Sequence, residues 1–416
     1  MSKLPLGWVE SKLKDIFDTT SGGTPNRGVS AYYGGDIPWL KSGELNDGII
    51  FSAEEYITNE GLQNSSAKLF PKGSLLIALY GATVGKLGIL NFDSTTNQAI
   101  CCIYQHENYN KYFLFYYLLN HKKYLIKQGK GGAQSNINQE IIKNLIIPLP
   151  PLNEQRRIVE KIEEEFGKID EGVEKLRFAL EQIKQYRQAV LKSAFDGKLY
   201  KTTEWEEKTL GQILTPRRER ITPNKHNGEL PFIGMDCIMP NSLKIHNSYK
   251  LKDTKSVAFV FYKNDVLYGR MRSYLNKVWQ ATFDGASSAE FIVFPENKQI
   301  TSGFLKYLLH QQTFVKYATR NASGDRPRVK FEADLAEYKI KLPKIDEQNL
   351  IVEKIENAFS IVEDLNKIIR QNLDKAEQLK QSILKKAFEG RLVPQDPNDE
   401  PASVLLEKIK AERKNK

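Results

Sequence analysis

Three short stretches in the second half of this 416-residue chain are rich in arginine. A guanidinium group offers paired N–H donors that match guanine edges and phosphate oxygens. Alternate residues of a strand share one face, so we expect Arg270 and Arg272 to point the same way. Any one of these bases could instead be solvated surface, but the three stretches together favour contact with DNA. The predicted contact residues are Arg217, Arg218, Arg220, Arg270, Arg272, Tyr274, Asn276, Lys277, Arg326 and Arg328.

The candidates in the first half of the chain are more polar than basic. Asn and Gln side chains can read adenine edges, and Lys side chains can bind phosphates. Each of these residues could instead cap a turn. The predicted residues are Lys41, Ser42, Lys86, Gln98, Lys130, Gln134, Ser135, Asn136 and Asn138.

The sequence carries no recognisable motif for catalysis or for metal binding. GATVGKLG (81–88) resembles a phosphate-binding loop, but three residues separate its glycines and Leu87 stands where Ser or Thr is needed. The five histidines lack metal-ligand spacing, and no C-x-x-C pair is present. No persuasive pair of catalytic carboxylates occurs. We therefore expect this chain to be non-catalytic and to bind neither metal nor cofactor.

The charge of the chain is unevenly distributed. It has 61 Lys and Arg against 51 Asp and Glu, a formal net charge of +10. Residues 200–340 alone carry 22 basic and 15 acidic side chains, and 22 minus 15 is a net of +7. Excess positive charge favours an anionic partner. We expect this stretch to bind nucleic acid most strongly, and the first half to depend more on polar contacts.

The composition also predicts the compartment. No uninterrupted apolar run approaches the ~18 residues of a membrane helix. The N-terminal sequence MSKLPLGWVESKLKD has no apolar signal region. Three cysteines, of which Cys101 and Cys102 are adjacent, cannot form a disulfide framework. These features predict a cytoplasmic protein without a membrane partner.

The elements that position the candidate residues are organised by an internal repeat. Residues 149–199 recur at 342–392 with a constant offset of 193, and 21 of 51 positions are identical without a gap. This identity indicates a duplication. Weaker matches extend outward, because IPWL (37–40) corresponds to LPFI (230–233) at the same offset.

Each copy of the repeat has the apolar 4,3 spacing of a coiled-coil helix. Ten of eleven seam positions are apolar over 159–194, and nine of eleven over 352–387. Both copies place a base at the same seam step, Arg187 and Lys380, and we expect these side chains to extend from the seam toward solvent. An apolar stripe needs a partner, and the other copy is the obvious one. We favour an antiparallel pair.

The ends of both helices are marked in the sequence. Proline precedes the N-cap candidates Asn153 and Asp346. Gly197 and Gly390 are placed as helix-ending glycines. Some 44 residues at 1.5 Å each make a helix of about 65 Å. The cyclic order of the repeat also predicts that the N-terminal PLGW (5–8) lies beside the C-terminal helix end.

The fold class is therefore predicted as α+β, with two divergent α+β domains linked by two long helices in an antiparallel coiled coil. Strand-like runs occur at 73–81, 99–105, 257–263 and 289–295, and amphipathic helices are expected at 111–129 and 302–318. The predicted segments are 1–148 and 200–341 as globular domains, 149–199 and 342–392 as helical spacers, and 393–416 as a tail whose short helix docks on a partner subunit or on the N-terminal domain.

These features resemble a known family, the specificity subunit of type I restriction–modification systems. The resemblance is carried by LPPLNEQRRIVEKIE with its second copy LPKIDEQNLIVEKIE, by the helix ends AFDGKL and AFEGRL, and by SGGTP followed by IPWLKSGEL. The tail at 391–413 is similar to the closing segment of that family. The resemblance covers essentially the whole chain.

The resemblance implies that each globular segment is a target-recognition domain for one half of an interrupted, asymmetric site in double-stranded DNA. It implies that the helices dock two methyltransferase (modification) subunits, which carry S-adenosylmethionine and methylate adenine. Restriction/translocase subunits that use ATP and magnesium would join them. Half-sites about 34–36 Å apart would suit two such domains, and helix length would then set the spacer. Two other classes stay open: a coiled-coil adaptor that binds only proteins, and a DNA enzyme with an unrecognised motif.

Overall fold

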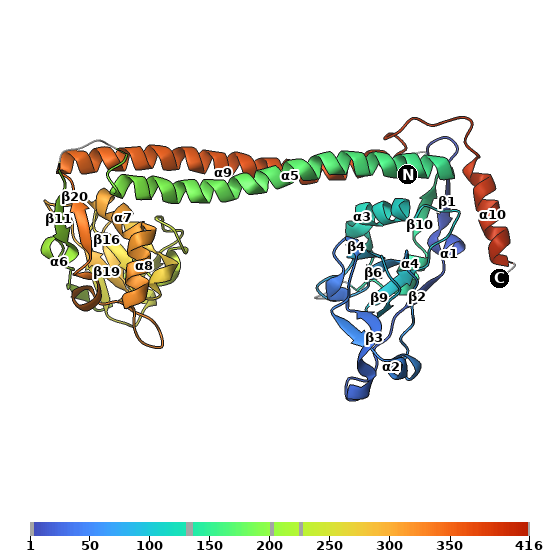
Figure 1. Cartoon of the computed structure of the whole chain (residues 1–416), viewed down its shortest axis with the longest axis horizontal. Coiled ribbons are helices and arrows are strands. Elements are labelled where there is room, and N and C mark those ends of the chain that lie inside the picture. Colours follow the sequence, from blue (N-terminus) through green and yellow to red (C-terminus); the bar gives the residue numbers. More distant parts are fainter. Residues whose placement is uncertain (1–3, 130–135, 200–203, 224–227, 415–416) are drawn as a thin grey trace. The chain divides into compact units, whose positions relative to one another are not determined.

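The computed structural model describes residues 4–129, 136–199, 204–223 and 228–414. The chain divides into two units, each with its own apolar core (Figure 1). Unit 1 is Met1–Glu174 with Asn372–Lys416, and unit 2 is Lys175–Gln371. Two long helices, α5 (Leu152–Phe195) and α9 (Ile345–Phe388), contribute to both units.

Unit 1 combines mixed β-sheets with helices that cover them. Among its described residues, a five-stranded sheet has the order β2 (Thr19–Ser21), β9 (Ile100–Ile103), β6 (Leu75–Ala78), β7 (Leu87–Leu90) and β4 (Gly48–Ile50). A second sheet has the order β5 (Glu55–Ile57), β3 (Tyr33–Leu40) and β8 (Thr95–Thr96), and β1 (Val9–Lys12) pairs with β10 (Ile146–Leu149). The helices are α1 (Leu13–Ile16), α2 (Asn59–Gln63), α3 (Lys111–Gln128), α4 (Gln139–Lys143) and α10 (Ala402–Lys414).

Unit 2 has a related arrangement. Its described residues form a sheet with the order β12 (Arg220–Ile221), β15 (Ala258–Phe261), β18 (Gly285–Ser287), β13 (Pro231–Ile233) and β14 (Tyr249–Lys250). A second sheet has the order β17 (Val278–Gln280), β16 (Val266–Gly269) and β19 (Phe291–Phe294), and β11 (Glu206–Thr209) pairs with β20 (Lys339–Leu342). The helices are α6 (Leu210–Ile213), α7 (Ser302–His310) and α8 (Gln312–Asn321).

The repeated sequences occupy corresponding elements. IPWL lies in β3, which pairs parallel to β8, and its counterpart at 230–233 lies in β13, which pairs parallel to β18. The four predicted strand runs are β6, β9, β15 and β19, and the helix predicted at 111–129 is α3. The single helix predicted at 302–318 is wrong. Gln311 has extended backbone angles (φ −68°, ψ 147°), so it ends α7 and caps α8.

The long helices have the predicted length, and their C-terminal ends lie where expected. Each contains 44 residues. Gly197 and Gly390 adopt φ of +71° and +65°, the left-handed conformation typical of a residue that ends a helix. The predicted N-caps are wrong by two residues each, because α5 begins at Leu152 and α9 at Ile345, so Asn153 and Asp346 already lie inside the first turns.

Within each unit the two helices pack antiparallel, as predicted. In unit 1 the early part of α5 shares a core with the late part of α9, and in unit 2 the late part of α5 shares a core with the early part of α9. The Lys380 ammonium lies 5.0 Å from the ring centre of Phe166, and the Arg187 guanidinium lies 4.2 Å from that of Phe359. These pairs are equivalent under the repeat. The two seam bases therefore make cation–π contacts instead of extending into solvent.

The C-terminal tail docks on the N-terminal segment of unit 1, which is one of the two predicted sites. Helix α10 lies beside α1 (Figure 1). Its Leu405 and Ile409 are buried in the core that also contains Trp8 and Leu13. The Gln395 side-chain amide donates a hydrogen bond of 2.8 Å to the Leu6 carbonyl. The described N-terminal and C-terminal segments are therefore side by side, as the cyclic repeat predicts.

Candidate nucleic-acid interface

The structure brings together two of the three arginine-rich stretches of unit 2. The Arg272 amide donates to the Pro327 carbonyl at 2.8 Å, and the Val329 amide donates to the Arg270 carbonyl at 3.0 Å. These bonds join the segment after β16 to the segment before Phe331. Arg218, from the third stretch, forms an ion pair with Glu332, close behind that segment. Backbone hydrogen bonds thus join two of the arginine-rich stretches, and an ion pair connects the third stretch to the residues just after them.

The expectation that Arg270 and Arg272 share a strand face is wrong. β16 ends at Gly269, and Arg272 adopts φ +53° as the residue before a short 3-10 turn, Ser273–Leu275. The left-handed backbone turns the chain after the strand has ended, so strand alternation does not set the directions of the two side chains. Arg272 and Tyr274 are exposed, whereas Arg270 is half-buried and its Nε has no hydrogen-bond partner among the described residues.

Two predicted contact residues of this stretch are buried. Asn276 is 1% exposed, and its side-chain amide donates to the His310 carbonyl at 2.9 Å. The Lys277 ammonium donates to the Met235 carbonyl at 2.7 Å, and burial lowers its pKa. Both side chains hold the turn in place and are buried, so neither is accessible to DNA.

The remaining arginines of unit 2 differ in accessibility. Arg217 makes a two-point ion pair with the buried Asp265, with distances of 2.9 and 3.1 Å, and stacks on Tyr262. It therefore stabilises the fold. Arg218, Arg220 and Arg326 are exposed. Arg328 is also exposed, and Glu290 accepts two hydrogen bonds from it.

In unit 1 the predicted residues are spread over several loops. The Lys41 ammonium lies 3.0 Å from Glu55 Oε1, and this hydrogen bond raises the pKa of Lys41. The exposed Gln98 accepts a hydrogen bond from Thr24. Asn138 caps α4 by accepting from the Ile141 amide at 2.8 Å, so for this residue the turn-capping alternative holds. Asn136 is exposed, whereas Ser42 and Lys86 are half-buried. Lys130, Gln134 and Ser135 lie outside the described residues.

Sequence reasoning missed Arg27. Its guanidinium lies 2.7 Å from Glu55 Oε2 and 4.5 Å from the ring centre of Tyr33. With Lys41 it lowers the pKa of Glu55. This arginine lies two residues after the SGGTP motif, which was the available signal. The cluster places two bases and an aromatic ring beside the strand that carries IPWL.

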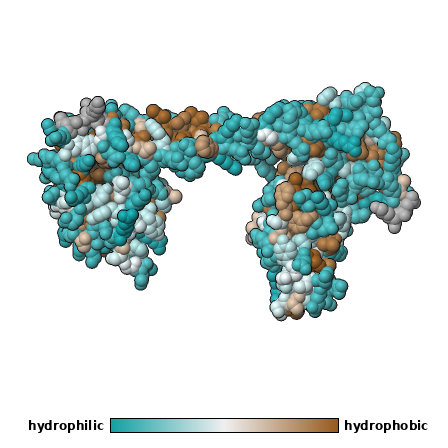
Figure 2. Space-filling model, viewed as in Figure 1, coloured by the Kyte–Doolittle hydropathy of each residue, from teal (hydrophilic) through white to brown (hydrophobic). Residues whose placement is uncertain are grey.

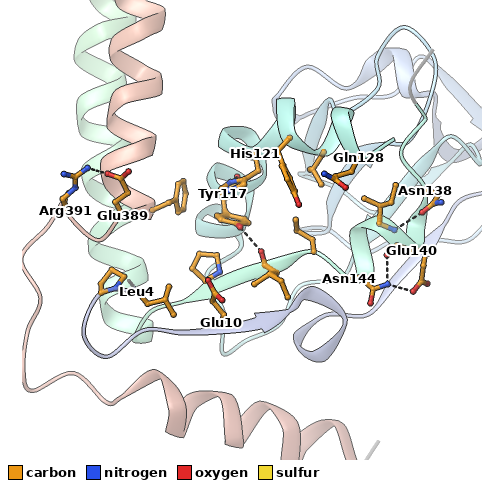
Figure 3. Close-up of a pocket in the computed structure, with 18 residues that line it drawn as sticks. Leu4, Glu10, Tyr117, His121, Gln128, Asn138, Glu140, Asn144, Glu389 and Arg391 are labelled. Carbon is orange, nitrogen blue, oxygen red and sulfur yellow. Dashed lines mark hydrogen bonds and ion pairs between the residues drawn. The ribbon is translucent and has the colours of Figure 1, made fainter. Parts of the chain in front are cut away.

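A groove of about 1250 Å³ lies elsewhere in unit 1, between α3, the β1–β10 ribbon and the end of α9 (Figure 3). The rings of Tyr117 and His121 stack in it at 4.1 Å, and burial lowers the pKa of His121. Its charged lining consists of Glu10, Glu140, Glu389 and Arg391, and Arg391 is paired with Glu389. The net negative lining does not suit a phosphate backbone.

The fold agrees with comparisons to known proteins. The family model described as the type I restriction modification DNA specificity domain matches residues 5–175 and 202–375. The chain therefore belongs to this family, as a non-catalytic DNA specificity subunit of a type I restriction–modification system. The family assignment confirms the predicted function class and the predicted fold class.

Individual relatives cover most of the chain. It is 28% identical to the EcoDI specificity subunit of Escherichia coli over 343 residues, covering 72% of this chain and 76% of the relative. It is 25% identical to the E. coli K12 EcoKI specificity subunit, covering 99% and 96%. A solved chain from work on assembly of a type I R-M system has a TM-score of 0.74 at 20% identity, covering 94% and 100%. At that identity the likeness concerns the fold. No helix in the described part of the chain is long and apolar enough to span a membrane.

Proposed function

We propose that the chain recognises a bipartite, asymmetric site in double-stranded DNA, with one globular segment for each half. Residues 1–148 and 200–341 act as the target-recognition domains. Residues 149–199 and 342–392 act as helical spacers. Residues 393–416 form a tail that docks on the N-terminal segment. The convergence of the arginine stretches in unit 2 is the observation that supports this assignment most strongly.

The proposed contacts are the accessible members of the predicted set. In unit 2 they are Arg218, Arg220, Arg270, Arg272, Tyr274, Arg326 and Arg328. In unit 1 they are Lys41, Ser42, Lys86, Gln98 and Asn136, with Arg27 added. The net charge of +7 over residues 200–340 supports stronger electrostatic binding by unit 2.

Salt dependence of DNA binding tests this proposal. The chain, co-expressed with its modification subunit, is titrated against a mixed duplex pool at several salt concentrations. Each phosphate contact adds about 0.9 to the slope of log K against log salt. Replacing Arg218 and Arg220 with Ala should reduce that slope by about 2 if both contact phosphates. A wild-type complex that does not bind the duplex pool at any of these salt concentrations would favour the protein-only adaptor instead.

The second part of the proposal concerns partner subunits. Ile361, Leu365 and Ile368 lie one helical turn apart on α9 and are 60%, 43% and 52% exposed. Figure 2 shows apolar side chains gathered on this part of the surface. A continuous exposed apolar stripe is typical of a protein interface. We assign it to docking of a modification subunit. S-adenosylmethionine, ATP and magnesium then belong to the partner subunits, and this chain binds none of them.

The repeat supplies a matched control for the docking surface. At the equivalent positions α5 has Lys168, Gly172 and Lys175, so the stripe belongs to the second copy only. Replacing Ile361 and Leu365 with Asp should reduce co-purification of one modification subunit. Replacing Lys168 with Asp should have no such effect. Equal retention of modification subunits by both variants would contradict the docking assignment.

A further inference from the structure

Arg328 is the most firmly held of the exposed arginines in unit 2. Its backbone exchanges two hydrogen bonds with Ser323, each of 3.2 Å, and forms an isolated bridge with Met271. Its guanidinium Nε and NH2 donate to the two carboxylate oxygens of Glu290 at 3.0 and 2.6 Å. Both backbone and side chain are therefore fixed before any ligand arrives.

Glu290 is itself held in the turn that precedes β19. Its amide donates to the Ser288 hydroxyl at 3.3 Å, and its carbonyl accepts from the Arg270 amide at 2.9 Å. Its side chain is 23% exposed and that of Arg328 is 42% exposed. The carboxylate thus lies behind an accessible guanidinium group.

The chemistry of this pair points to a base edge. A guanidinium has five N–H groups, and Glu290 occupies the edge formed by Nε and NH2. The remaining edge, formed by NH1 and the second N–H of NH2, has no partner among the described residues. Two parallel donors match the N7 and O6 acceptors of guanine in the major groove. Since the carboxylate already orders the long side chain, less rotamer entropy is lost on binding.

The surroundings separate Arg328 from two similar pairs. Arg217 uses the same fork with Asp265, but it is only 23% exposed and stacks on a tyrosine ring. Arg218 and Glu332 make an ion pair in which the side chains are 75% and 60% exposed, so little orders either of them. Arg328 alone among these three arginines is both ordered and accessible.

Resting on the proposed function, we propose that Arg328, held by Glu290, reads a guanine in the half-site bound by unit 2. Arg328 is then a specificity-determining residue, and Glu290 is a positioning residue that touches no base. The exposed neighbours Arg272 and Arg326 would supply phosphate contacts on either side.

Selection from a randomised duplex pool by the chain in complex with its modification subunit tests this inference. The wild-type motif should contain a guanine at which Arg328→Ala lowers discrimination about 10–100-fold, while the other half-site is unchanged. Arg328→Lys should relax the same position, because Lys keeps the charge but lacks the fork. Glu290→Gln should lower discrimination there without lowering affinity for unrelated DNA. Arg177→Ala, at an exposed arginine of α5 that lies outside the proposed contacts, is the control and should leave every position unchanged.

The outcomes separate this inference from the proposed function. If the wild-type complex selects no motif, the proposed function fails and the inference fails with it. If the wild type selects a bipartite motif that Arg328→Lys leaves unaltered, the inference alone is wrong. A uniform loss of affinity for all sequences in both Arg328 variants would assign this residue to phosphate binding and would also overturn the inference. Thermal melting of each variant shows whether unit 2 stays folded, and Arg328→Lys serves where Arg328→Ala does not fold.

Discussion

Two buried glutamines, equivalent under the repeat, join the long helices to their globular segments, and their removal should destabilise the units unequally. The Gln348 side chain is 0% exposed. Its Oε1 accepts a hydrogen bond from the Thr301 backbone amide at 2.8 Å, and its Nε2 donates to the backbone carbonyls of Gln299 and Pro343, each at 2.9 Å. Thr301 is the N-cap of α7. At about 1 kcal/mol per hydrogen bond, Gln348→Ala should lower the free energy of unfolding of unit 2 by about 3 kcal/mol.

Gln155 provides the matched comparison in unit 1. Its side chain is also 0% exposed. Its Oε1 accepts a hydrogen bond from the backbone amide of Asn110 at 2.8 Å, and Asn110 is the N-cap of α3. Its Nε2 donates to the Pro150 carbonyl at 2.9 Å. With two hydrogen bonds instead of three, Gln155→Ala should cost unit 1 about 2 kcal/mol.

Hydrogen exchange during urea titration measures both effects in the full chain, since peptides report on each unit separately. Gln348→Ala should accelerate exchange in α7 and β20 and leave α3 and β10 unchanged. Gln155→Ala should give the reverse pattern. Two results would refute the idea that each glutamine stabilises its own unit. One is a Gln348→Ala variant as stable as the wild type, and the other is an equal loss of unfolding free energy in both units from either variant.

Three further predictions concern pH, helix ends and spacing. Burial lowers the pKa of His310 to about 3, so below pH ~6.5 the unfolded chain takes up a proton that the native chain does not. Unit 2 should therefore lose stability as the pH falls from about 6.5 to about 3, and His310→Gln should remove this pH dependence in urea titrations. Replacing Gly197 or Gly390 with Ala should lower the free energy of unfolding by about 1–2 kcal/mol, because both glycines have a left-handed backbone. Gly390→Ala should lower it more, because the added Cβ would lie 2.3 Å from Pro5 Cγ, and denaturant midpoints would rank the two variants. Deleting one heptad from both α5 and α9 should change the spacer of the methylated motif and not its half-sites, and an unchanged spacer would contradict this prediction.

The long helices could be predicted from sequence because their signal is local and repeated. Apolar residues at most of the three- or four-residue steps over 159–194 and 352–387 leave few alternatives to a paired helix. The gapless duplication then supplied the partner for each helix. The break at Gln311 was not visible, since both flanking segments favour a helix and only tertiary packing decides where the chain turns.

The candidate site could be predicted only in part. Composition located the arginine-rich stretches, but it could not distinguish Arg217 from Arg328, since both are arginines in such a stretch. Their carboxylate partners, Asp265 and Glu290, lie 48 and 38 residues away, so only the fold shows which arginine is packed and which is accessible. Asn276 was predicted as a DNA contact because it lies in an arginine-rich stretch, yet its side-chain amide donates to the His310 carbonyl.

The central claim is that each globular segment specifies one half of a bipartite DNA site. Its most direct test is genomic adenine-methylation mapping in a host without other modification systems, with the chain and its modification subunit expressed together. The wild type should give one interrupted, asymmetric motif, and replacing residues 200–341 with the corresponding segment of a relative should change one half and leave the other half and the spacer unchanged. A contiguous motif, or a change in both halves after the replacement, would contradict the claim.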